Sequence, residues 1–271
     1  MNIIATCLGA IKRMLSFNVL KTLYINFKLF PFEIARKLPL KIYYNVDIQI
    51  DKGGVRFRPG TEIQRFMVSI GDFPYPMSSL KGSYTYIRIS PTAKLILGKD
   101  ITIRNGANIV VGRQGCMTLG DGVLINSKTL VYSNMQVDIE DNVRISWNVQ
   151  IMDSDFHFVY NENKNAVKYC SAPVVIGKNS WIGNHTIVCK GTKIPPYSIL
   201  SSGSLINKDF SLLESKGNLF VGRPAVLKQT GIYRIFDERK ENELFSRFQQ
   251  NNFETIYLTD AELTILGNRQ V

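Results

Sequence analysis

Two histidines, His157 and His185, are the side chains best suited to proton transfer, and of the two only His157 has acidic neighbours. It closes the run DSDFH, which contains Asp153 and Asp155. A neutral imidazole can take the proton of a hydroxyl nucleophile, and a nearby carboxylate can fix the ring tautomer and stabilise the imidazolium. We therefore expect His157 to be a general base, with Asp153 or Asp155 as its partner. Considered alone, a solvent-exposed loop histidine is the simpler interpretation.

Metal catalysis is not expected from this sequence. A zinc hydratase site needs three histidines, and the chain has two. The sequence has no P-loop, no G-x-S-x-G motif and no dinucleotide-binding fingerprint. Its four cysteines lack CxxC spacing, so reduced thiols are the simplest interpretation.

A six-residue repeat dominates the sequence from Ile176 to Asp209. Aliphatic residues recur in steps of six, at Ile176, Ile182, Val188, Ile194, Leu200 and Ile206. A small polar residue follows four positions after each of the first five, at Ser180, Thr186, Thr192, Ser198 and Ser204. This period fits neither a helix at 3.6 residues nor an amphipathic strand at 2. It predicts a parallel β-helix, in which each hexad forms one short strand and one corner around an aliphatic core.

The loop that carries His157 interrupts this repeat. An earlier frame starts at Leu97, slips at 112–115 and again after Val137, and ends at Ile151. The next clean repeat position, Ile176, lies 25 residues after Ile151, which is not a multiple of six. We expect residues 153–173 to leave the coil as a loop, and loops on rigid scaffolds often carry binding and catalytic residues.

The segments outside the repeat are predicted in less detail. We divide the chain into residues 1–86, a helical segment with irregular strands, 87–228, the β-helix, and 229–271, a C-terminal extension. Residues 72–86 are expected to be a loop. The extension contains a helix candidate at 237–248 and a strand candidate at 254–266, and we expect it to be a cap or an interface arm.

The N-terminal segment, residues 1–45, is expected to contain an amphipathic helix rich in Lys and Arg. Its apolar residues are spaced to share one face: Leu8, Ile11, Leu15, Leu20, Leu23 and Phe27. That face could cap the end of the β-helix, or the basic helix could lie on an anionic membrane surface. Both interpretations stay open.

The whole chain carries a net charge of +11, from 33 basic and 22 acidic residues. Such a charge favours anionic partners: phosphates, acidic lipid headgroups, nucleic acid or acidic glycans. No stretch has the length and apolarity of a membrane span. Lys12 and Arg13 follow the first apolar run instead of preceding it, so we expect no signal peptide. We expect a cytoplasmic protein that could touch the inner face of the membrane peripherally.

The repeat, the DSDFH run at its interruption and the closing run Gly222-Arg223-Pro224-Ala225 together resemble the hexapeptide-repeat acyltransferases, which fold as left-handed β-helices. The sequence is similar in particular to the maltose, galactoside and polysaccharide O-acetyltransferases, over residues 87–228. The resemblance implies a homotrimer, acetyl-CoA as the acyl donor, and His157 as the base that activates the acceptor.

The same resemblance implies a donor site. Trp181 would line the cleft, Asn184 could contact the acyl donor, and His185 would be a bystander. Asn126 is a candidate to polarise the thioester carbonyl or to hold the acceptor. The positions that match the pantetheine and phosphate contacts are Gly183, Ser202, Gly203, Asn207, Lys208, Arg223 and Lys228.

Two features leave the donor contacts open. The family usually reads G-A-G-S where this chain has SSGS at 201–204, so the contact made by Ser202 is not fixed. Lys208 and Arg223 could equally be solvated surface charges.

These observations predict an acetyl-CoA-dependent O-acetyltransferase that acts on a sugar hydroxyl of a surface polysaccharide or its nucleotide- or lipid-linked precursor. The alternatives are N-acetylation of an amino sugar and a non-catalytic trimeric scaffold or binding module. No nucleic-acid partner and no metal are expected.

Overall fold

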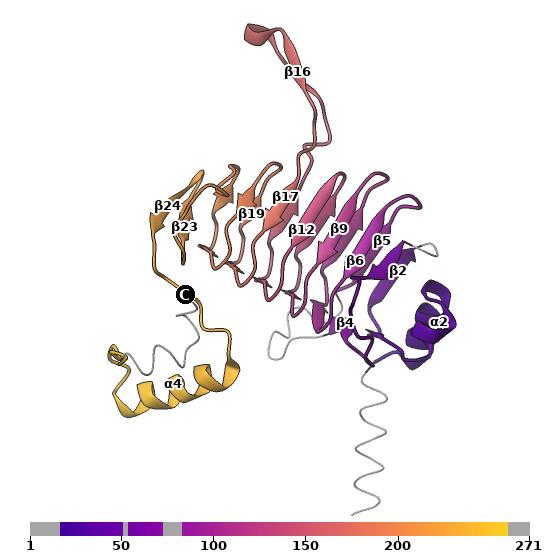
Figure 1. The fold of residues 1–271 in the computed structure, drawn as a ribbon, viewed down its shortest axis with the longest axis horizontal. Coiled ribbons are helices and arrows are strands. Elements are labelled where there is room, and N and C mark those ends of the chain that lie inside the picture. Colours follow the sequence, from indigo (N-terminus) through magenta and orange to yellow (C-terminus); the bar gives the residue numbers. More distant parts are fainter. Residues whose placement is uncertain (1–16, 51–53, 73–82, 260–271) are drawn as a thin grey trace, which may run out of the picture.

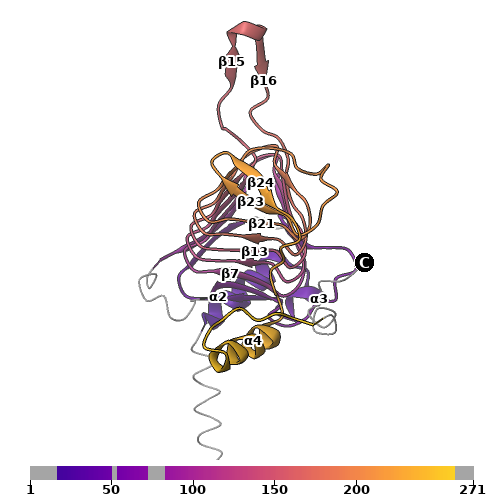
Figure 2. The same cartoon turned by 90° about the vertical axis from the view of Figure 1, so that its left-hand side faces the viewer.

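The computed structural model describes residues 17–50, 54–72 and 83–259, and most of them form one coil of short parallel strands. The coil is a triangular prism whose faces are three sheets, here named A, B and C, so that each turn passes the A–B, B–C and C–A corners in that order (Figures 1 and 2). The coil winds left-handed, as the view along its axis shows (Figure 2). It is an exception to the usual right-handed rule for parallel crossovers. The predicted left-handed parallel β-helix is confirmed.

The strands of each sheet come from successive turns of the coil. Sheet A contains β1 (Leu40–Ile42), β4 (Val68–Asp72), β7 (Ile101–Arg104), β10 (Leu124–Ile125), β13 (Arg144–Ile145), β18 (Trp181–Ile182), β21 (Ile199–Leu200), β23 (Leu219–Gly222) and β24 (Ala225–Gln229). Sheet B contains β2 (Val46–Ile50), β5 (Thr85–Ile89), β8 (Asn108–Val111), β11 (Leu130–Ser133), β14 (Gln150–Met152), β19 (Ile187–Val188) and β22 (Leu205–Ile206). Sheet C contains β3 (Val55–Phe57), β6 (Lys94–Leu97), β9 (Cys116–Leu119), β12 (Gln136–Ile139), β17 (Val174–Ile176) and β20 (Lys193–Ile194). The coil therefore begins at Leu40, well before the expected boundary at residue 87.

The interior of the prism explains the six-residue repeat. The six repeat aliphatic residues, spaced six apart from Ile176 to Ile206, are at most 3% exposed, and burying each such side chain contributes about 1.5–3 kcal/mol. The small polar residue of each hexad is buried at a corner. The hydroxyls of Ser180, Thr186, Thr192 and Ser198 donate to backbone carbonyl oxygens, whereas the Ser204 hydroxyl has no hydrogen-bond partner among the described residues. The Thr186 hydroxyl, for example, donates to the Ser201 carbonyl oxygen of the next turn at 3.1 Å. A larger side chain would not fit between adjacent turns, so each corner requires a small residue.

Between β14 and β17 the chain leaves the coil at the B–C corner and projects as a hairpin (Figures 1 and 2). Strands β15 (Val159–Asn161) and β16 (Ala166–Lys168) are antiparallel, and the 3-10 helix η2 (Glu162–Lys164) joins them. Every residue from 155 to 169 is exposed. A bridge between Ser154 and Ser171 closes the base of the hairpin. The hairpin lies within 153–173, where the sequence frame is broken.

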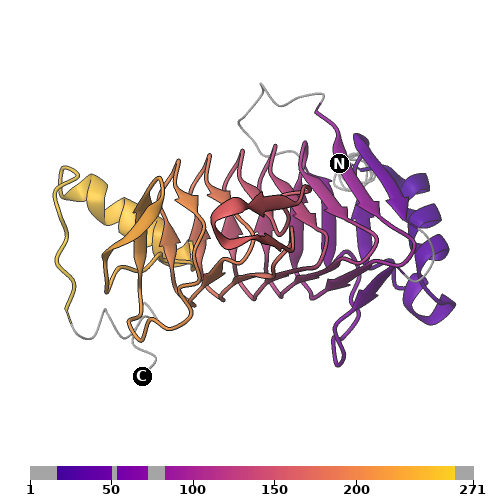
Figure 3. The same cartoon turned by 90° about the horizontal axis from the view of Figure 1, so that it is seen from above.

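Helix α2 (Val19–Leu29) covers the N-terminal end of the prism, with the short α3 (Phe32–Ala35) after it (Figure 3). Its buried side chains are Thr22, Ile25, Asn26 and Leu29. The Asn26 amide bonds both the N–H and the carbonyl of Leu40, at 3.0 and 2.8 Å. The Thr22 hydroxyl accepts from the Ile42 N–H at 3.0 Å. Polar helix residues therefore satisfy the open edge of β1, which would otherwise expose unpaired backbone groups.

The expectation that Leu20, Leu23 and Phe27 form the capping face is wrong. These side chains are 80%, 39% and 48% exposed and point away from the prism. The reason is the open strand edge, since β1 needs hydrogen-bond partners more than it needs further apolar contact. Leu8, Ile11 and Leu15 lie outside the described residues.

The C-terminal extension returns along the prism after the antiparallel hairpin of β23 and β24. The Tyr233 ring packs on Tyr197 at 6.3 Å between centroids. Helix α4 (Glu238–Gln250) follows close to the predicted range and ends the described helices. The predicted strand at 254–266 is absent from its described part, 254–259, and the rest lies outside the described residues. Among the described residues, no helix is long and apolar enough to cross a membrane.

Candidate active site

His157 stands at the base of the projecting hairpin, in a hollow of about 360 Å³. The hollow is lined by Asp155, His157, Val159, Asn161, Lys164, Ala166, Lys168 and Lys190. Strand alternation explains this lining, because Val159 and Asn161 face the same side of the hairpin as Ala166 and Lys168. The imidazole is exposed and makes no hydrogen bond within the described part of the chain. It is thus open to an incoming hydroxyl group.

Asp155 shares this hollow but is paired with a lysine. Its carboxylate lies 2.6 Å from the Lys190 ammonium, and the same ammonium donates to the Tyr169 carbonyl oxygen at 3.3 Å. Lys190 follows β19 at the B–C corner of the next turn, so the ion pair ties the base of the hairpin to the coil. The sequence offered no signal for Lys190, since it lies 35 positions after Asp155 (190 − 155).

Asp153 has a different role from the one expected. It is fully buried, and its carboxylate accepts from the backbone N–H groups of Asn134, Met135 and Gln136 at 2.7–2.8 Å. The Ser133 hydroxyl adds a bond at 3.1 Å. These bonds brace the B–C corner of the preceding turn, where the sequence frame slips. The hydrogen bonds of the Asp153 carboxylate all go to residues 133–136 of this corner, so Asp155 is the carboxylate left beside His157.

A second group of predicted residues lies at the A–B corner. The Ser202 hydroxyl donates to the Asn184 amide oxygen of the preceding turn at 2.6 Å. The Asn126 amide donates to the Ile145 carbonyl oxygen at 2.9 Å. A Cβ on Gly183 would lie 2.6 Å from the Ser202 backbone nitrogen, so close packing of turns requires this glycine. Gly203 has a φ of +74° and open space beside it. This corner presents a ladder of amide and hydroxyl groups.

Trp181 lies on sheet A just before this ladder and is partly covered by the C-terminal extension. Its indole N–H donates to the Ser146 hydroxyl at 3.1 Å. The Arg234 guanidinium lies over the ring, 5.6 Å from its centroid. Burial lowers the pKa of Arg234, and the charge of Glu241 partly offsets that change. Sequence reasoning missed Arg234, because residues 229–271 carry no motif that links them to the indole.

The remaining predicted donor residues line neither the His157 hollow nor the ladder at the A–B corner. Asn207 and Lys208 follow β22 at the B–C corner, and Arg223 and Lys228 lie on the hairpin of β23 and β24. All four are exposed. In the described part of the chain, the cations Lys208, Arg223 and Lys228 form no ion pair. His185 is an exposed corner residue with a φ of +60°.

The chain therefore presents the predicted residues along two edges of the prism. His157, Asp155, Asn207 and Lys208 lie at the B–C corner, whereas Asn126, Asn184, Ser202 and Gly203 lie at the A–B corner. Sheet B separates the two edges. A single chain does not bring His157 and the ladder together.

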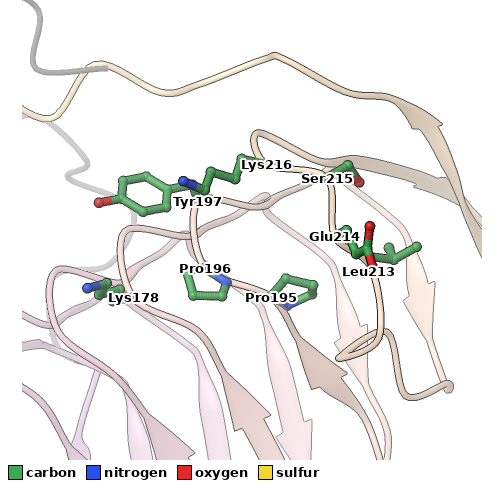
Figure 4. A pocket seen from close by; sticks show the side chains of 8 residues that line it. All are labelled: Lys178, Pro195, Pro196, Tyr197, Leu213, Glu214, Ser215 and Lys216. Carbon is green, nitrogen blue, oxygen red and sulfur yellow. The ribbon is translucent and has the colours of Figure 1, made fainter. Parts of the chain in front are cut away.

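Another hollow, of about 410 Å³, lies at the C–A corner beneath the loop that precedes β23 (Figure 4). Its lining comprises Lys178, Pro195, Pro196, Tyr197, Leu213, Glu214, Ser215 and Lys216. None of these was a predicted site residue. The Glu214 carboxylate and the side chains of Lys178 and Lys216 are part of this lining, but no histidine is.

One thiol lies beside the His157 hollow. Burial raises the pKa of Cys189, and the charge of Asp155 raises it further. This thiol is therefore kept protonated near neutral pH, which makes it a poor nucleophile. Among the described residues, no cluster of three His, Cys, Asp or Glu side chains could hold a metal ion.

Comparison with known proteins gives relatives of one kind. No protein-family model matches the chain. Galactoside O-acetyltransferase of Escherichia coli (strain K12) is 32% identical over 104 residues, which are 38% of this chain and 47% of that relative. The resemblance to the hexapeptide-repeat acetyltransferases is confirmed. The chain spans about half the length of the curated relatives that it matches.

Two solved structures show a distant likeness. The acetyltransferase NeuO, described as specific for polySia, has a TM-score of 0.49 and 14% identity, and covers 79% of this chain and 82% of its own. A mutant of the N-acyltransferase AntD from Bacillus cereus, in complex with dTDP and coenzyme A, has a TM-score of 0.42 and 16% identity. The match covers 83% of this chain and 98% of AntD.

Proposed function

We propose that the protein is an O-acetyltransferase that moves an acetyl group from acetyl-CoA to a sugar hydroxyl, on a surface polysaccharide or its precursor. The observation that carries this proposal is the exposed His157 imidazole, held in a hollow at the point where a hairpin leaves a hexapeptide coil. The similarity to galactoside O-acetyltransferase supports the reaction class.

The proposed reaction needs one proton acceptor and no metal. The sugar hydroxyl attacks the thioester carbonyl carbon while the His157 imidazole takes its proton. The tetrahedral intermediate collapses as the C–S bond breaks, which leaves an acetyl ester on the sugar. The leaving sulfur takes the proton from the imidazolium, so His157 returns to its neutral form and free coenzyme A is released.

Acetyl-CoA would bind along the A–B corner and reach the closing hairpin. The amide and hydroxyl ladder of Asn126, Asn184 and Ser202 offers partners for the amide groups of the pantetheine arm. Arg223 and Lys228 are exposed and free of ion pairs in the described part of the chain, so they suit the phosphates. Trp181 provides an aromatic wall beside the ladder.

The separation of the two corners supports a homotrimer with sites shared between chains. A B–C corner of one chain would face the A–B corner of the next. The hairpin supports the same arrangement, because Phe158, Tyr160, Val167 and Tyr169 are each more than half exposed on the face opposite the His157 hollow. An isolated two-stranded hairpin is marginally stable in water, and a neighbouring chain would cover this aromatic face.

We also infer a peripheral contact with an anionic membrane through the outer face of α2 and α3. Leu20, Tyr24, Phe27 and Phe32 are each 48–80% exposed there. Lys28, Arg36 and Lys37 lie beside them and are exposed, and the acidic residue of α3, Glu33, is paired with Arg36 at 3.0 Å. An apolar face flanked by basic residues is typical of helices that lie in the membrane interface.

The decisive experiment replaces His157 by Ala and measures release of free coenzyme A thiol with a panel of sugar acceptors. We expect turnover to fall by about 10²–10⁴-fold, with an unchanged circular dichroism spectrum. Wild-type turnover in the variant would overturn the proposal. Products from amino-sugar acceptors, identified by mass spectrometry, would separate N-acetylation from O-acetylation. A wild-type protein that turns over no acceptor would favour a scaffold or binding module.

A further inference from the structure

The hairpin has two chemically different faces. One face carries the aromatic side chains that include Phe158 and Tyr169, whose rings lie 6.1 Å apart. The other face carries Asn161 and Lys168, and it turns toward the hollow that holds His157. Lys164, from η2, joins this second face at the tip of the hairpin. His157 thus shares its hollow with polar and cationic groups as well as with the apolar Val159 and Ala166.

The charges in this hollow do not cancel. Three lysines and one aspartate line it, and Lys190 is neutralised by Asp155 at 2.6 Å. The ammonium groups of Lys164 and Lys168 form no ion pair or hydrogen bond with any described residue. Two unpaired cations beside one base raise the local positive potential and attract an anionic ligand.

The position of these cations favours the acceptor over the donor as their ligand. The donor residues of the proposed site lie at the A–B corner and on the hairpin of β23 and β24, whereas Lys164 and Lys168 lie on the hairpin that carries the base. A group bound to Lys168 therefore lies on the same wall as the hydroxyl that His157 would deprotonate. Asn161 adds an amide that can donate to or accept from a sugar hydroxyl.

We propose that Lys164 and Lys168 form an anion-binding subsite for the acceptor, so that the enzyme selects glycans carrying a carboxylate or a phosphate. This inference rests on the proposed acetyl transfer with His157 as the base. The anionic group anchors the acceptor through charge-assisted hydrogen bonds, and Asn161 orients its ring. Neutral sugars lack the anchor and bind more weakly.

The test compares three acceptors of equal length: a neutral oligosaccharide, one with a carboxylate and one with a phosphodiester. The variants are Lys164→Gln, Lys168→Gln and the double variant, with Lys99→Gln as the matched control, an exposed lysine at the C–A corner. We expect each hairpin substitution to raise the KM for an anionic acceptor about two- to fivefold, the range for an exposed ion pair. In these hairpin variants the KM for acetyl-CoA and the kcat should stay close to the wild-type values. In the control, Lys99→Gln, no kinetic constant should change.

Further measurements make the result specific. Raising the salt concentration should raise the wild-type KM for anionic acceptors only, since screening weakens exposed charge pairs. Lys168→Arg should restore binding. The carboxylate and phosphodiester arms show which anion is preferred. A rise in the KM for acetyl-CoA instead would assign the lysines to the donor and overturn the inference, and so would equal kcat/KM values for neutral and anionic acceptors.

Failure of the subsite can be separated from failure of the proposed reaction. Calorimetric titration of the three acceptors into protein without acetyl-CoA reads binding even where no acetyl group is transferred. Weaker binding of the anionic acceptors by the double variant supports the subsite whatever the reaction. Transfer that depends on His157 but not on Lys164 or Lys168 would leave the proposed function intact and remove the subsite.

Discussion

Asp153 and Asp155 are two positions apart, yet one is buried and the other is exposed beside His157. Both lie close enough to His157 in the sequence to be its carboxylate partner, and only the fold shows which of them is beside the imidazole. Asp153 bonds residues 134–136 of the preceding turn, and nothing in the sequence links these positions. The loop position of His157 could be predicted because the repeat breaks around it, whereas the neighbours of this histidine depend on which turns stack.

We expect Asp153→Asn to destabilise the fold. The amide would have one oxygen acceptor in place of a carboxylate and would turn an N–H group toward backbone donors. Loss of a hydrogen bond to a charged group costs about 1.5–3 kcal/mol, so the midpoint of urea unfolding should fall. Asp155→Asn, whose carboxylate is half exposed, serves as the control and should leave the midpoint nearly unchanged. Equal midpoints for wild type and Asp153→Asn would contradict the bracing role.

The Cys189 thiol reports the charge state of Asp155. A negative charge nearby disfavours the thiolate, and this raises the thiol pKa in addition to the effect of burial. Asp155→Asn removes that charge, so the pKa should fall and alkylation of Cys189 at a fixed pH near 8 should become faster. Rates of iodoacetamide labelling against pH, followed by mass spectrometry of the Cys189 peptide, measure the shift. If the pH at the midpoint of Cys189 labelling is unchanged or higher in Asp155→Asn, the proposed coupling between Asp155 and Cys189 is contradicted.

The elements follow from the sequence to different degrees. Hexads determine short strands directly, because a buried aliphatic residue and a small corner residue are both local requirements. The orientation of α2 is not a local property. Its apolar stripe predicts the helix, but Thr22 and Asn26 face the prism because the edge of β1 needs polar partners. The C-terminal contact between Arg234 and Trp181 was likewise unreadable, since it joins segments without a shared motif.

The exposed stripe of α2 leads to a prediction about membranes. Leu20→Ser with Phe27→Ser should reduce flotation with phosphatidylserine-containing vesicles, because insertion of each apolar side chain contributes up to about 1.5–3 kcal/mol. Lys28→Gln should weaken flotation less, by about 1 kcal/mol at low salt. Both residues of the double variant are already exposed, so the fold should persist.

Leu212→Ser is the control for this experiment, since Leu212 is 94% exposed near the other end of the coil. It should float like the wild type. Salt should release the wild-type protein by screening the basic residues. If the double variant and the wild type float equally, the α2 face is not the contact. If neither floats under any salt condition, α2 serves only as a cap.

At the scale of the whole molecule, the proposed site is divided between two prism edges. The spacing of the hexads could not predict this division, because hexads are alike on all three faces; the homotrimer was implied only by the resemblance to the acetyltransferases. Which corner receives a residue depends on the count of turns and on slips in the frame. His157 belongs to the B–C corner, and Ser202 belongs to the A–B corner. A closed ring of identical chains would bring one edge of each chain to the other edge of its neighbour.

This arrangement predicts that two inactive variants restore activity in mixed trimers. His157→Ala removes the base, and Ser202→Tyr adds a ring to the A–B corner, where Ser202 is exposed. Each variant alone should be inactive. In co-expressed mixed trimers a shared site needs its base from a Ser202→Tyr chain and its ladder from a His157→Ala chain. Random assembly in a cyclic trimer gives about a quarter of the sites this composition, so about a quarter of wild-type turnover should return.

Sedimentation equilibrium checks that the mixtures are trimers. Mixed trimers without activity would mean that each site lies within one chain, and a monomer that is fully active would exclude sharing altogether.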